Sequence, residues 1–228
     1  MYISGLQKLT LLDFPGRLAA TVFLGGCNFR CPFCHNGTLV LSPSSCEKIS
    51  EDDLFEFLES RRGKLSGVCV TGGEPTLYPD LKNFIKRIKD MSFAVKLETN
   101  GTNPDLLSEL IDEGLVDYVA MDIKNSPEKY AVTVGTSCDM EKIGRSVDIL
   151  LSDKVDYEFR TTVVKELHTE ADFLKISEWI KGAKRYFLQT FEDSGDLIGS
   201  GFSAYSREES EAILRRILPY VPNAQIRS

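Results

Sequence analysis

The chain has 228 residues, of which 42% are hydrophobic and 27% are charged, a composition that suits a single globular domain. Its net charge of -7 argues against a general nucleic-acid-binding protein, which would carry a basic surface. The sequence has no run of about 18 apolar residues, and its N-terminus lacks a basic stretch followed by an apolar one. We therefore expect a cytoplasmic protein with no membrane span and no secretory signal.

Apolar runs alternate with helical periods along most of the chain. The helical period is clearest at Leu81, Phe84, Ile85 and Ile88, which recur every three or four residues. This alternation predicts an α/β fold, in which helices cover a parallel sheet. The predicted strands span 18–24, 67–70, 93–97, 116–121, 157–164 and 185–189, and the predicted helices span 51–62, 81–88, 104–113, 141–151, 171–181 and 207–218.

Glycine-rich or polar segments follow several of the predicted strands. They lie at 25–27, 71–74, 99–101 and 122–124. In parallel α/β folds the ligand site lies at the carboxyl ends of the strands, so these segments are expected to converge there. Residues 192–206 are polar and glycine-rich, which predicts a loop and a candidate flexible flap over the site.

Three cysteines, Cys27, Cys31 and Cys34, lie close together on one short segment. A four-iron cluster usually takes four cysteines, so three would leave one iron free to bind a small molecule. Structural zinc is the alternative, with His35 as fourth ligand, although zinc sites usually draw ligand pairs from two separate knuckles. A disulfide is disfavoured because three cysteines leave one unpaired in a chain that indicates a reducing compartment.

The other cysteines are scattered, and Cys69 lies in an apolar run that predicts a small buried hydrophobic residue. Cys46 and Cys138 lie in polar stretches with no evident role. The second histidine, His168, falls in a polar turn and is expected to be solvated.

Taken in order, the motifs resemble those of the radical S-adenosylmethionine (SAM) superfamily. Within it they are most similar to the glycyl-radical-enzyme activases, a group that includes the activators of anaerobic ribonucleoside-triphosphate reductase and of pyruvate formate-lyase. This resemblance implies a partial (β/α)6 TIM-like barrel as a single domain over 1–228, with its core at about 18–190 and a C-terminal loop and helix over 191–228. The motifs are CNFRCPFC at 27–34 followed by HN, TGGEP at 71–75, ETNG at 98–101, MDIK at 121–124 and FRTTVV at 159–164.

The resemblance implies that Cys27, Cys31 and Cys34 hold a [4Fe-4S] cluster and are the catalytic residues. The open iron would chelate the amino and carboxylate groups of SAM. The reduced cluster would then pass one electron to the sulfonium, and the resulting 5′-deoxyadenosyl radical would take a hydrogen atom from the target.

The resemblance also assigns SAM contacts. Glu74 would accept a hydrogen bond from the methionine amino group. Phe33 would pack on adenine, or shield the cluster as a hydrophobic side chain, or do both. Arg160, a cation in an apolar strand, would pair with the SAM carboxylate or, alternatively, with an acid of the protein core. Asp122 and Lys124 would face the same ligand or form an exposed ion pair. The full predicted set is Phe33, Gly72, Gly73, Glu74, Thr99, Asn100, Asp122, Lys124 and Arg160.

A monovalent cation, Na+ or K+, is a further candidate ligand. Glu98, Thr99 and Asp122 match residues that help to bind such a cation beside the SAM carboxylate in the activases. The family usually has Asp where this chain has Glu98. Because the Glu98 side chain is longer, the sequence does not decide whether the cation site is present. The alternative for Asn100-Gly101 is an ordinary turn.

The resemblance implies a glycyl radical enzyme as protein partner, with anaerobic ribonucleoside-triphosphate reductase favoured, and a flavodoxin or ferredoxin as electron donor. One alternative is the activase of another glycyl radical enzyme such as pyruvate formate-lyase. A second is a small-molecule enzyme similar to 7-carboxy-7-deazaguanine synthase, for which the sequence shows no clear set of polar residues inside the barrel. A third is a zinc-stabilised binding module without catalysis.

Overall fold

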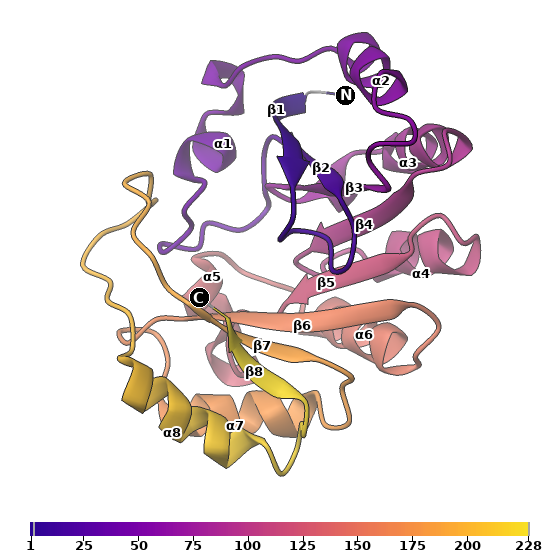
Figure 1. The fold of residues 1–228 in the computed structure, drawn as a ribbon. Helices are drawn as coiled ribbons and strands as arrows, with labels where there is room; N and C mark the ends of the chain where they lie inside the picture. Colours follow the sequence, from indigo (N-terminus) through magenta and orange to yellow (C-terminus); the bar gives the residue numbers. More distant parts are fainter. Residues whose placement is uncertain (2, 228) are drawn as a thin grey trace.

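The protein, described here by a computed structural model of residues 1 and 3–227, is built on one curved sheet with helices along its outer face (Figure 1). The eight strands follow one another in chain order across the sheet. The first pair is antiparallel and all later pairs are parallel. The strands are β1 (Ile3–Thr10), β2 (Ala19–Leu24), β3 (Gly67–Gly72), β4 (Ala94–Thr99), β5 (Tyr118–Asp122), β6 (Asp156–Val163), β7 (Tyr186–Thr190) and β8 (Ala224–Arg227).

The helices connect the parallel strands, so the chain forms the predicted α/β fold as an open, partial barrel. Short 3-10 turns follow α1 at Pro43–Ser45, β3 at Pro75–Leu77 and β5 at Pro127–Lys129. No helix of the described residues is long and apolar enough to cross a membrane. The helices are α1 (Gly37–Leu41), α2 (Glu51–Glu59), α3 (Leu81–Asp90), α4 (Pro104–Asp112), α5 (Tyr130–Val134), α6 (Met140–Leu151), α7 (Glu170–Trp179) and α8 (Arg207–Ile217).

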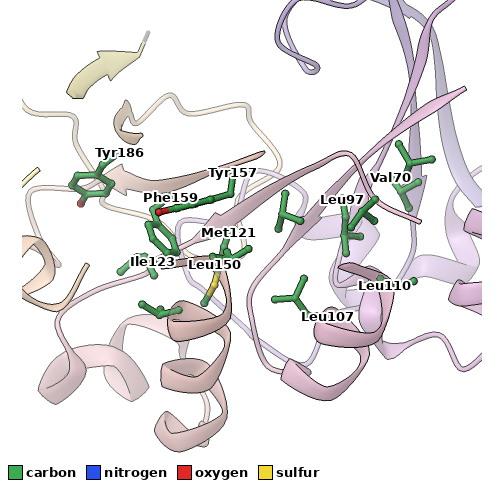
Figure 2. Packing of buried hydrophobic residues seen from close by; sticks show 14 of the residues in the cluster. Val70, Leu97, Leu107, Leu110, Met121, Ile123, Leu150, Tyr157, Phe159 and Tyr186 are labelled. Atoms are coloured by element: carbon green, nitrogen blue, oxygen red, sulfur yellow. The ribbon is translucent and has the colours of Figure 1, made fainter. Parts of the chain in front are cut away.

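The core lies between the parallel strands and the helices that cover them (Figure 2). Val70 of β3 pairs in register with Leu97 of β4, and both are fully buried. Leu107 and Leu110 of α4 lie near them in the same cluster. Apolar burial of this kind fixes the strand register, because a shift by one residue would turn every core side chain outward. Because β2 to β8 pair in parallel, their carboxyl ends lie at one edge of the sheet.

Two strands were not predicted from the sequence, β1 and β8. β1 is an edge strand whose burial pattern shows no regular alternation, and two irregularities interrupt its pairing with β2. β8 is only four residues long. Neither strand therefore carries the apolar run or the period of two that identifies a strand in a sequence. The short helices α1 and α5 were also missed, because five residues are too few to show a helical period.

Candidate active site

A cavity of about 280 Å³ opens at the carboxyl ends of the strands. Cys27, Cys31 and Cys34 line it, together with Phe33. Residues from the ends of β3 to β6 also line it, as the segment spacing predicted. Of the predicted site residues, the cavity brings together all but Glu74: Cys27, Cys31, Phe33, Cys34, Gly72, Gly73, Glu98, Thr99, Asn100, Asp122, Lys124 and Arg160.

The cysteine segment is an irregular loop whose backbone is held by specific hydrogen bonds. Cys34 N–H donates to the carbonyl of Cys31 at 3.0 Å, and Phe29 N–H donates to Cys27 Sγ at 3.3 Å. The side-chain amide of Asn100 lies 3.9 Å from the same sulfur. Burial raises the pKa of Cys27 and raises that of Cys31 to about 12, so iron binding there would release protons.

The donor set fits a cluster better than a single zinc ion. Among the residues that the structure describes, no three Cys, His, Asp or Glu side chains converge as the ligands of one ion must. In a four-iron cluster each thiolate binds a different iron, so the sulfurs need only surround a larger group. Phe29 and Phe33, which are 3% and 4% exposed, make the cysteine side of the cavity apolar.

The glycines after β3 allow this strand end to touch the cysteine loop. A Cβ on Gly73 would lie 1.8 Å from the carbonyl oxygen of Gly26. Gly73 N–H donates to the carbonyl of Leu24 at 2.8 Å, and Glu74 N–H donates to that of Gly26 at 2.9 Å. Only glycine permits so close an approach of two backbones.

Glu74 is the predicted site residue that does not line the cavity in the ligand-free chain. Its side chain is fully buried, and its carboxylate is bonded by groups of the protein. One oxygen accepts hydrogen bonds from Thr76 N–H, from the Thr76 hydroxyl and from the Thr99 hydroxyl, and the other accepts from Asn100 N–H. The carboxylate thereby fixes the turn that carries Thr99 and Asn100.

Arg160 lies between two carboxylates of neighbouring strands. Its guanidinium forms a bidentate pair with Glu98, at 2.9 and 3.1 Å, and its Nε lies 3.0 Å from Asp122. Burial raises the pKa of both acids, but two cations at each acid together outweigh it and hold both pKa values below their usual range. They are Arg160 and Lys96 at Glu98, and Arg160 and Lys124 at Asp122. The structure therefore shows the alternative partner for Arg160, an acid of the protein itself.

The same arrangement occupies the oxygens that were predicted to bind a monovalent cation. Arg160 already supplies a positive charge between Glu98 and Asp122, and Lys124 Nζ lies 2.9 Å from the second oxygen of Asp122. The Thr99 hydroxyl donates to Glu74 and accepts from Gly101 N–H. The three residues predicted to bind Na+ or K+ thus have their oxygens engaged by groups of the protein.

His168 is buried rather than solvated, which the polar turn around it did not reveal. Its side chain is 1% exposed, with Nε2 2.8 Å from the carbonyl oxygen of Lys124 and Nδ1 3.2 Å from Val164 N. A neutral ring that donates from Nε2 and accepts at Nδ1 satisfies both contacts. Burial lowers the pKa of His168, and the ring holds the segment that presents Lys124.

The scattered cysteines lie outside the cavity. Cys69 is fully buried in β3, as predicted. Cys46 and Cys138 are partly exposed.

Comparison with known proteins identifies the class. The family model of the radical SAM superfamily matches residues 21–180, and the chain belongs to this superfamily. A Methanocaldococcus jannaschii protein, provisionally named a glycyl-radical enzyme activating enzyme, is 36% identical over 198 residues, which cover 83% of this chain and 80% of that protein. The protein is thus a radical SAM enzyme of the activase-like type, and the family implies a [4Fe-4S] cluster and SAM.

The chain is also similar to one further protein in sequence and to one solved structure in fold. A 7-carboxy-7-deazaguanine synthase from Methanopyrus kandleri is 30% identical over 179 residues, which cover 68% of this chain and 70% of that protein. A solved domain of a pyruvate-formate lyase-activating enzyme from Bacteroides vulgatus has a TM-score of 0.57 at 18% identity, covering 72% of this chain and 99% of that one. The second likeness is one of fold.

Proposed function

We propose that this protein activates a glycyl radical enzyme, with Cys27, Cys31 and Cys34 holding a [4Fe-4S] cluster and SAM bound beside it. The observation that carries the proposal is that one cavity joins the three thiols to the charged ends of β4, β5 and β6. When bound, the cluster and SAM supply a one-electron cleavage of the sulfonium and a carbon radical that takes a hydrogen atom from the target glycine.

The proposed role of the chain's own residues is to bind SAM and to orient it beside the cluster. Lys124 and Arg160 present cations to the cavity for the carboxylate of SAM, and Asp122 offers acceptors for its hydroxyls and amino group. The backbone of Gly72 and Gly73 lines the cavity, where it can approach a ligand closely. Phe33 provides an apolar face for adenine and keeps water from the cysteine side.

Thr99 and Asn100 complete the proposed SAM site. Glu74 acts beneath it as a positioning residue, because its hydrogen bonds fix the turn that carries both side chains. The cytoplasm is the proposed location, and a flavodoxin or ferredoxin the proposed electron donor. An open barrel leaves room at its carboxyl edge for a loop of a protein partner, and anaerobic ribonucleoside-triphosphate reductase is the proposed partner.

The test is anaerobic reconstitution with iron and sulfide, followed by reduction and addition of SAM and the candidate reductase. We expect an electron paramagnetic resonance doublet from a glycyl radical on the reductase. Cys31→Ala should abolish cluster formation and SAM cleavage, whereas Cys46→Ser, which removes a thiol outside the cavity, should leave both intact. SAM cleavage by Cys31→Ala at the parent rate would refute the assigned ligands.

A second function has its own support. The polar side chains of Gln7, Thr162 and Gln189 line the cavity, although the sequence showed no such set. Together with the similarity to a deazaguanine synthase, they favour a small heterocyclic substrate as the competing proposal. Turnover of a free metabolite without any protein partner would decide for this alternative.

A further inference from the structure

The loop after β7, residues 192–206, is anchored at both ends, and we call it the strap. Figure 1 shows it as the orange loop that rises from β7 toward α1. Its C-terminal part is held by the segment after β6: Lys165 N–H donates to the carbonyl of Ser203 at 3.0 Å, and the Tyr205 hydroxyl donates to the carbonyl of His168 at 2.6 Å. The expected flap is thus a loop with defined contacts.

The N-terminal part of the strap contacts the backbone on both sides of Cys34. Gly199 N–H donates to the carbonyl of Pro32 at 2.7 Å, and the Ser194 hydroxyl donates to the carbonyl of His35 at 3.1 Å. Gly37 N–H donates to the carbonyl of Asp196 at 2.8 Å. These contacts satisfy backbone groups of an irregular loop that secondary structure does not pair.

Asp196 adds charge-assisted contacts to the start of α1. Its carboxylate accepts hydrogen bonds from Thr38 N–H, at 3.0 and 3.1 Å, and from the Thr38 hydroxyl at 2.7 Å. Asn36, the residue before α1, makes no such side-chain cap, so Asp196 caps this helix from 158 positions away in the sequence. The hydrogen bonds that Thr38 donates favour the charged carboxylate and thereby lower the pKa of Asp196.

Glycine at position 37 is required by the same contact. A Cβ there would lie 2.6 Å from the carbonyl oxygen of Asp196. The backbone of the strap therefore meets the start of α1 without a side chain between them. An alanine at this position would push the strap away while leaving Asp196 itself unchanged.

We propose that Asp196 is a positioning residue for the cluster: through the strap it fixes the backbone around Cys34 and so the place of the third thiolate. The proposal rests on the proposed cluster ligands, but its structural part holds for the metal-free chain. A ligand loop whose backbone is bonded on both sides holds its thiolate in place, and groups that orient metal ligands in this way strongly affect metal retention.

The test compares Asp196→Ala and Gly37→Ala with the parent and with Glu192→Ala, a control that removes an exposed carboxylate from the same strap. The first measurement is hydrogen exchange of residues 34–41 in the metal-free chain. The second is the rate at which the reconstituted protein loses iron to a chelator, and the third is the electron paramagnetic resonance spectrum of the reduced cluster, which a merely structural role would not alter.

We expect both strap variants to exchange faster at 34–41 and to lose iron about tenfold faster, with an altered cluster spectrum, while Glu192→Ala matches the parent. Iron loss and a cluster spectrum like those of the parent in both strap variants would overturn the inference, as would equal effects in the control. A parent chain that takes up no iron would instead refute the proposed cluster site, and unchanged exchange in the metal-free variants would still refute the role of the strap.

Discussion

Glu74→Gln separates two roles for Glu74: the direct contact with SAM that the family motif implies, and the positioning of a turn that its buried hydrogen bonds support. Thr76 N–H donates to one carboxylate oxygen at 3.0 Å, and Asn100 N–H donates to the other at 2.6 Å. Hydroxyls of Thr76 and Thr99 complete the set. Glutamine keeps the shape of the side chain but replaces one acceptor by a donor.

The cost follows from the geometry of the two backbone donors. Hydroxyls of Thr76 and Thr99 can rotate to accept from the new amide, but a backbone N–H cannot. Since Thr76 N–H and Asn100 N–H address opposite oxygens, either orientation of the amide leaves one of them facing an NH2 group. An unsatisfied buried donor costs about 1–3 kcal/mol. For a chain of this size that lowers the melting temperature by about 2–12 °C.

The assay is urea unfolding of the metal-free chain, paired with SAM binding to the reconstituted protein under anaerobic conditions. Glu56→Gln, which changes an exposed carboxylate on α2, is the control and should leave the free energy of unfolding unchanged. The reasoning would be refuted if Glu74→Gln unfolded like the parent but bound SAM more than about tenfold more weakly, the size expected for loss of a direct charged hydrogen bond.

Three further changes give distinct outcomes. Gly73→Ala should displace the cysteine loop, because its Cβ would lie 1.8 Å from a loop carbonyl; iron content should fall while circular dichroism stays like that of the parent. Arg160→Met should destabilise the chain by about 1–3 kcal/mol in urea unfolding, because Glu98 and Asp122 lose its hydrogen bonds while Lys96 and Lys124 remain 2.9 Å from them. The pKa of His168 is lower in the folded chain than in the unfolded chain, so as the pH falls the unfolded chain takes up the His168 proton first. The contribution of His168 to folding stability is therefore complete above about pH 6.5 and is lost as the pH falls toward the folded-state pKa. His168→Gln should make the free energy of unfolding less steeply dependent on pH between about pH 7 and 5.

The elements that the sequence predicted are those whose pattern is local. In α3, Leu81, Phe84, Ile85 and Ile88 recur at the helical period, and all four are buried. The edge strand β1 could not be predicted in this way. Its pairing with β2 depends on a turn and on register irregularities that no residue pattern marks. Local periodicity therefore predicts the covered strands and helices and misses the edges.

The candidate site was predictable to the extent that strand ends determine it. Chain segments that follow parallel strands must meet at one edge, and the cysteines, glycines and charged residues do meet there. Partners brought from distant segments were not predictable. His168 lies in a polar turn, yet its ring is buried against the carbonyl of Lys124, 44 positions earlier in the chain. Asp196 caps α1 across a still longer separation.

The partner of Arg160 could not be predicted from the sequence alone. A cation in an apolar strand needs a negative partner, and the sequence offered two kinds, a cofactor carboxylate or an acid of the core. Strand register decides between them: Asp122 of β5 pairs directly with Arg160 of β6, and Glu98 lies on the next strand, β4. Both acids therefore reach the guanidinium before any ligand enters. A SAM carboxylate must then share a charge that is already paired, so loss of Arg160 should act on folding stability first and on SAM affinity second.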